Sequence, residues 1–131
     1  MTAISTRTSD SLLRFALRLD ATVTGLFGVA LAAVAGPAST LTGLTPTQEY
    51  VTGAALVLYG VVVYQLAGLR SVRRAGIGVV IANLVCTVAA VAVVASGALP
   101  LTGFGVAALL ASAAYTAAFA VAQYAGVRRM T

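Results

Sequence analysis

The chain has 131 residues, of which 60% are hydrophobic and 8% are charged, and it carries a net charge of +5. A soluble domain has about 25% charged residues, so this composition cannot cover a water-soluble surface. The basic residues stand between apolar runs instead of forming a patch on a polar fold, which excludes a nucleic-acid partner. The length allows one domain, and its main partner is predicted to be the lipid bilayer.

Several residue types that carry common chemistry are missing. The chain has no His, and its eight basic residues are all arginine. Without His, the usual haem and zinc ligands and a His general base are unavailable. Cys86 is the only cysteine, and inside an apolar run we expect it to be a small buried hydrophobic residue. We therefore predict no metal, no cofactor, no catalytic residue and no enzymatic activity.

The first 20 residues are predicted to form a cytoplasmic tail and a short interfacial helix. Residues 1–10 are polar, whereas residues 11–19 are mostly apolar, with Arg14 and Arg18 four positions apart on one helix face. Two interpretations stay open for residues 11–19. They could lie on the inner leaflet as an amphipathic helix, or they could extend the first membrane span while the arginines reach back to the interface.

Four apolar runs follow, at residues 21–36, 50–69, 75–96 and 104–127. Each approaches the ~20 residues with which a helix crosses the bilayer. The runs lack the alternation of barrel strands, so we predict an all-α fold, a four-helix transmembrane domain over residues 21–131. Gly36-Pro37 is expected to end the first helix, and Thr45-Pro46-Thr47-Gln48 has the pattern of a capping box that begins the second.

The arginines indicate how these spans are oriented. They all fall before the first span, between the second and third, or after the fourth: Arg7, Arg14, Arg18, Arg70, Arg73, Arg74, Arg128 and Arg129. Because basic residues are enriched in cytoplasmic loops, both termini and residues 70–74 are predicted to be cytoplasmic. The chain is thus predicted to be a multi-pass protein of a bacterial inner (plasma) membrane, with residues 37–49 and 97–103 outside.

Two fragments recur at nearly the same offset. Gln65-Leu66-Ala67-Gly68-Leu69-Arg70 matches Gln123-Tyr124-Ala125-Gly126-Val127-Arg128, and Leu41-Thr42-Gly43-Leu44 matches Leu101-Thr102-Gly103-Phe104. We interpret them as traces of a duplication, in which two parallel helix hairpins are related by an axis along the membrane normal. Coincidence in a chain rich in Ala, Val and Gly is the alternative.

Small residues recur at helical spacing within the spans. Gly53, Gly60 and Ala67 are seven positions apart on the second span, and Gly25 and Gly28 lie on the first. The fourth span carries Ala108, Ala111, Ala118, Ala122 and Gly126. Small residues allow helix backbones to approach closely in lipid. We expect these positions to pack inside the bundle, with a dimerisation surface as the alternative.

Few strongly polar side chains lie within the spans, and all of them fall in the cytoplasmic half. The candidates for a polar pocket are Asp20, Thr24, Gln65, Asn83 and Gln123. A ligand site facing the cytoplasm is one interpretation, and hydrogen bonds that bridge helices are the other. An ionisable group inside a span is costly and often functional. We expect Asp20 to point into the bundle and to meet either an arginine or the amides.

One stretch supports a family resemblance. Leu17-Arg18-Leu19-Asp20, followed by Thr24-Gly25-Leu26-Phe27-Gly28 and combined with four short spans, resembles the small DoxX-like membrane proteins and other four-helix proteins of actinobacteria. The resemblance implies a four-helix bundle and, for some members, a link to quinones or respiratory complexes.

Three functions are compatible with these features. The first is a non-catalytic accessory or scaffolding subunit of a larger membrane complex, which would bind other subunits or itself. The second is a small oligomeric transporter or channel, and the third is a lipid- or quinone-binding membrane protein. The first is preferred because the chain lacks catalytic groups and has almost no residues outside the predicted spans.

Overall fold

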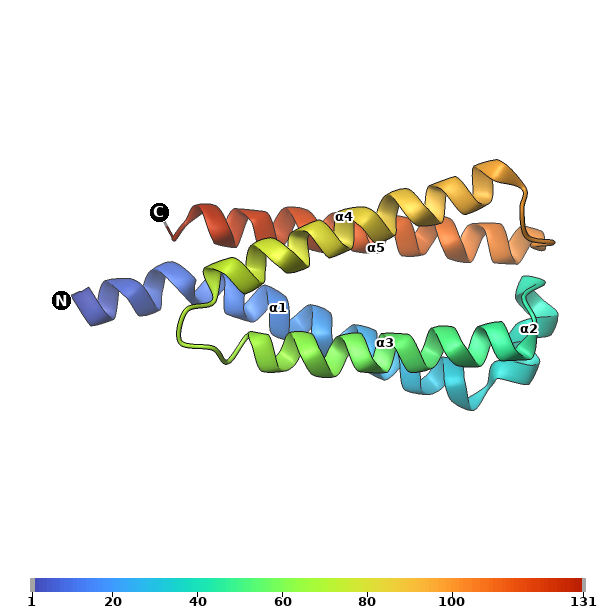
Figure 1. Cartoon of the computed structure of the whole chain (residues 1–131), viewed down its shortest axis with the longest axis horizontal. Coiled ribbons are helices and arrows are strands. Elements are labelled where there is room, and N and C mark those ends of the chain that lie inside the picture. The colour runs from blue at the N-terminus through green and yellow to red at the C-terminus, as the bar shows by residue number, and fades with distance from the viewer. Residues whose placement is uncertain (1, 131) are drawn as a thin grey trace.

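The computed structural model describes residues 2–130, with side chains from residue 10 onward, and this part of the chain is all-helical (Figure 1). Its helices are α1 (Thr2–Ala33), α2 (Ala35–Thr42), α3 (Pro46–Leu66), α4 (Arg73–Ser96) and α5 (Gly103–Arg128). The predicted all-α class is confirmed. Four of these helices, all but α2, are long and apolar enough to cross a membrane.

The four long helices run along the same axis of the molecule (Figure 1). Both termini and the α3–α4 connection lie at one end, and α2 and the α4–α5 connection lie at the other. The helices pair as two hairpins, because α1 packs mainly on α3 and α4 mainly on α5. Contacts between α1 and α5 join the hairpins, so α1 belongs to both halves of the bundle.

Helix α1 continues without a break through residues 11–19, for which an interfacial helix and an extension of the first span were both open. No helix end separates residues 11–19 from the apolar run that follows, which is the geometry of the second interpretation. The inward stripe explains this continuity. Leu13, Leu17 and Asp20 are fully buried, with Ala21 next to them, so one face of α1 is covered by the bundle on both sides of residue 20.

The expected stop at Gly36-Pro37 is wrong in detail. Helix α1 ends at Ala33, and α2 begins at Ala35 after the single residue Val34. Pro37 thus stands in the first turn of α2, where its missing N–H breaks no helical hydrogen bond. Helix α2 ends at Thr42, and the next residue, Gly43, adopts a left-handed φ of 87° and donates its N–H to Ser39 O. Only a residue without Cβ adopts this conformation freely.

The capping box at the start of α3 is confirmed. The Thr45 hydroxyl accepts the Gln48 N–H at 3.1 Å, and Gln48 Oε1 accepts the Thr45 N–H at 2.9 Å, with Pro46 at the first helical position. These two bonds satisfy N–H groups that the first turn of a helix leaves without partners. The start of α3 is therefore encoded locally.

Glycines let α1 and α3 approach with their backbones in contact. A Cβ added to Gly53 would lie 2.7 Å from Gly28 O, and one added to Gly60 would lie 2.7 Å from Ala21 O. The expectation that small residues pack inside the bundle holds for this seam. On α5 it holds for Gly126, which is buried against Leu13, whereas Ala111 and Ala118 are exposed and the buried alanines are Ala113 and Ala120.

The recurring fragments at residues 41–44 and 101–104 contact each other and join the hairpins at the end opposite the termini. Thr102 N–H donates to Thr42 O at 2.9 Å, and a Cβ on Gly105 would lie 2.1 Å from the same oxygen. The fragments differ in conformation, because Gly43 is a left-handed helix end whereas Gly103 is the first residue of α5. The duplication therefore stays a prediction.

Candidate functional site

A single carboxylate lies at the centre of the bundle. Asp20 is fully buried on α1, and Thr24, one helical turn further on, is 8% exposed. Residues four apart stand one above the other on a helix, so both side chains lie on the stripe that Leu13 and Leu17 begin. The packing of α1 between α3 and α5 thus carries the acid into the interior.

Donors from all four long helices surround this carboxylate. Oδ2 accepts from Tyr59 OH on α3 at 2.8 Å, from Asn83 Nδ2 on α4 at 3.2 Å and from Gln123 Nε2 on α5 at 2.9 Å. Oδ1 accepts from the Thr24 hydroxyl at 2.9 Å and from Tyr115 OH on α5 at 3.3 Å. The residues of this Asp20 cluster are Asp20, Thr24, Tyr59, Asn83, Tyr115 and Gln123.

The members of the cluster also bond to one another. Asn83 Nδ2 donates to Gln123 Oε1 at 2.9 Å, and the Thr24 and Tyr115 hydroxyls lie 2.8 Å apart. Among the described residues, every buried side-chain nitrogen and oxygen has a hydrogen-bond partner. Such complete satisfaction makes a buried polar network rigid and avoids the cost of orphaned polar groups.

The chemistry of the cluster is that of a carboxylate held by neutral donors. An ionised carboxylate is purely an acceptor with about four lone-pair sites, and hydroxyl and amide groups occupy both of its oxygens. The described residues contain no group of three His, Cys, Asp or Glu side chains that could hold a metal. The arrangement can tie four helices together through one acid.

The structure brings together four of the five residues predicted to form the pocket. Asp20, Thr24, Asn83 and Gln123 are in contact, and Asp20 meets the amides and not an arginine. Gln65 does not join them, because it is exposed on α3. Val63 faces the bundle, and a side chain two positions further along a helix points in a direction rotated by about 200°. Gln65 therefore points away from the interior.

Sequence reasoning missed the two tyrosines. Tyr59 and Tyr115 lie near the middle of their helices, where a phenol O–H needs a hydrogen-bond partner if it is buried. That need was the available signal, since few acceptors other than Asp20 lie at this depth. The Tyr115 ring also packs at 4.8 Å from the Phe119 ring, which fixes its position on α5.

Other polar groups lie outside the cluster. The Thr87 and Thr116 hydroxyls are 2.6 Å apart between α4 and α5. Glu49, 2% exposed at the opposite end from the termini, accepts from the Thr42 hydroxyl. Cys86 is exposed on α4, so the expectation that it is buried is wrong. It lies on the outward face of a helix whose outside is apolar.

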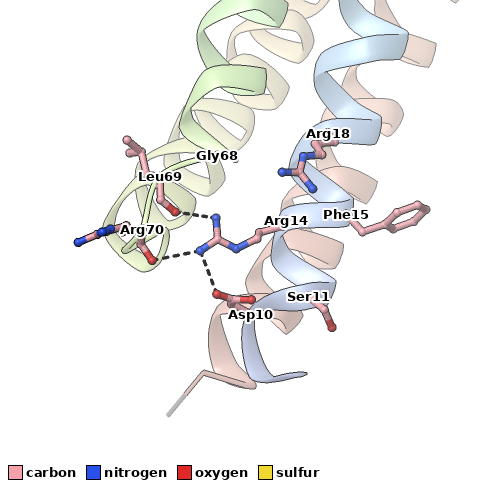
Figure 2. A pocket seen from close by; sticks show the side chains of 8 residues that line it. All are labelled: Asp10, Ser11, Arg14, Phe15, Arg18, Gly68, Leu69 and Arg70. Carbon is pink, nitrogen blue, oxygen red and sulfur yellow. Dashed lines mark hydrogen bonds and ion pairs between the residues drawn. The ribbon is translucent and has the colours of Figure 1, made fainter. Parts of the chain in front are cut away.

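Arg14 ties α1 to the end of α3 (Figure 2). Its Nη1 donates to Ala67 O at 2.7 Å and Leu69 O at 2.6 Å, and its Nη2 donates to Arg70 O at 3.1 Å. Nη2 also forms an ion pair with Asp10 Oδ2 at 2.9 Å. The guanidinium thus satisfies carbonyls that the end of a helix leaves without partners, so this residue has a structural role.

Comparisons with known proteins give no relative for this architecture or site. No family model, no curated protein and no solved structure matches the chain.

Proposed function

We propose that the chain is a four-span protein of the plasma membrane that acts as a non-catalytic accessory or scaffolding subunit of a larger membrane complex. Both termini and the α3–α4 connection would face the cytoplasm, since the arginines gather at that end. The observation that carries the proposal is the closed Asp20 cluster. Its donors and acceptors are used within the bundle, which supports a structural role for the acid.

The outward surface supports the same role. Large apolar side chains are exposed on all four long helices, among them Phe27 at 58%, Leu58 at 65%, Val88 at 68% and Val121 at 70%. In a bilayer such a surface is compatible with lipid and with the spans of other subunits. Helix association in lipid depends on close packing and not on the hydrophobic effect, so a rigid apolar bundle is suited to it.

Isolation from native membranes tests the proposal. The chain would be tagged at its C-terminus, expressed at its natural level, extracted in mild detergent and analysed by size-exclusion chromatography and mass spectrometry. We expect a membrane-protein partner in fixed stoichiometry. Isolation of the chain alone, combined with solute transport by the purified protein in liposomes, would contradict the proposal and favour a transporter.

A further inference from the structure

An open hollow of about 580 Å³ lies at the arginine-rich end, between α1 and the α3–α4 connection (Figure 2). Arg14 and Arg18 line it from α1, and Gly68, Leu69 and Arg70 line it from the other side. Figure 2 shows the Arg18 side chain pointing from α1 toward the side on which Gly68, Leu69 and Arg70 lie. This position is separate from the Asp20 cluster.

Arg14 and Arg18 differ in what they bind. Arg14 is occupied by Asp10 and by backbone carbonyls. Arg18 is exposed and, among the side chains that the structure describes, has no hydrogen-bond or ion-pair partner. It lies one helical turn further into α1, about 6 Å along the axis, within the stretch Asp10–Ala33 that is apolar enough to cross a membrane.

The chain cannot supply a side-chain counter-ion for Arg18. Its three acidic residues are Asp10, Asp20 and Glu49. Asp10 pairs with Arg14, Asp20 is enclosed by its cluster, and Glu49 lies at the other end of the bundle. An unpaired guanidinium at the edge of the hydrocarbon is costly, and a planar guanidinium binds phosphate oxygens through two parallel N–H donors.

We propose that this hollow binds the phosphate headgroup of an anionic phospholipid, with Arg18 donating to the phosphate. Arg70 stands on the opposite rim with its side chain directed outward (Figure 2), and its positive charge favours an anionic headgroup over a zwitterionic one. Phe15 and Leu69, exposed by 64% and 45%, flank the hollow and are suited to acyl chains. The site does not depend on a protein partner, so it stands or falls separately from the proposed subunit function.

Tryptophan fluorescence offers a direct test, since the chain contains no Trp. Phe15→Trp places a reporter beside the hollow, and Phe104→Trp places a matched reporter at the other end, where Phe104 is 58% exposed. Each variant is reconstituted in vesicles that mix ordinary phosphatidylcholine with either brominated phosphatidylglycerol or brominated phosphatidylcholine. Bromine quenches only the tryptophan that its lipid contacts.

We expect half-maximal quenching of Trp at position 15 at about a fivefold lower mole fraction of brominated phosphatidylglycerol than of brominated phosphatidylcholine. This ratio is the preference for an anionic lipid that the charge of one arginine at a lipid surface gives. At position 104 the two lipids should quench equally. Adding Arg18→Gln should remove most of the preference for phosphatidylglycerol. Arg73 is exposed but outside the hollow, so Arg73→Gln should leave this preference unchanged. Arg18→Lys should retain part of it.

Several results would overturn the proposal. Equal quenching by the two lipids at position 15 would exclude an anionic preference, and this comparison needs no arginine variant. An equal loss from Arg18→Gln and Arg73→Gln would indicate diffuse surface charge. Removal of the preference by excess inorganic phosphate, with chloride at matched ionic strength as the control, would show that the site takes free phosphate.

Discussion

Removing the Asp20 carboxylate should destabilise the bundle, and the size of the effect can be derived from the hydrogen bonds it breaks. In Asp20→Ala, Asn83 retains its bond to Gln123 Oε1, and the Thr24 and Tyr115 hydroxyls retain each other. Gln123 Nε2 loses its acceptor at 2.9 Å, and Tyr59 OH loses the bond at 2.8 Å and keeps only a longer one to Asn83 Oδ1 at 3.4 Å. One orphaned buried donor at about 1–2 kcal/mol and one hydrogen bond weakened by about 0.5–1 kcal/mol predict a loss of about 1.5–3 kcal/mol.

Asp20→Asn should cost far less, about 1 kcal/mol or below. Its amide oxygen can take the place of Oδ2 and accept from Tyr59, Asn83 and Gln123. Its NH₂ group then replaces Oδ1 and donates to the Thr24 or Tyr115 hydroxyl, because a hydroxyl rotates and accepts as readily as it donates. The variant removes the buried charge and keeps the network connected.

The free energy of unfolding can be measured by SDS titration of the purified variants in mixed micelles, followed by far-UV circular dichroism. Ser112→Ala serves as the control, since Ser112 is exposed and bonds only to its own helix at Ala108 O. It should change the free energy by less than about 0.5 kcal/mol. The reasoning is refuted if Asp20→Ala matches the control, or if Asp20→Asn destabilises as much as Asp20→Ala.

Two further predictions concern packing and topology. Gly60→Ala should destabilise the bundle by about 1–3 kcal/mol in the same titration, because its Cβ would meet the α1 backbone. The control is Gly78→Ala, whose Cβ has nothing within 4 Å, and it should be neutral or slightly stabilising. Equal effects of the two substitutions would refute the close packing of α1 on α3. In a Cys86→Ser background, Ala98→Cys should react with an impermeant maleimide on intact cells and Ser71→Cys only after permeabilisation; the reverse pattern would overturn the orientation.

Sequence alone predicted the long helices well, because a lipid-spanning segment must be both helical and apolar along its length. Their ends were harder to predict. The capping box at Thr45 is a local hydrogen-bond pattern and was recognised, whereas the α1–α2 break at Val34 has no comparable signature. The continuity of α1 through residues 11–19 depends on burial of Leu13 and Leu17 against other helices, a tertiary effect.

The site was predicted in part for a related reason. In a helix that is apolar on every side, hydrophobicity does not reveal which face is buried, so only polar and small residues report it. Asp20, Asn83 and Gln123 were found because a buried acid and amides need partners. Gln65 was misplaced because its polarity alone does not fix its face. Tyr59 and Tyr115 were missed because tyrosine is also common at membrane interfaces.

The most direct test is whether the proposed complex survives replacement of the Asp20 carboxylate by an amide. Wild-type chain and Asp20→Asn would be isolated side by side from native membranes, and the ratio of partner to chain would be measured by quantitative mass spectrometry. If the Asp20 cluster only holds the four helices together, the ratio and the cellular phenotype should be unchanged. A folded Asp20→Asn protein that loses its partner or its cellular role would show that the carboxylate itself is functional and would contradict the account.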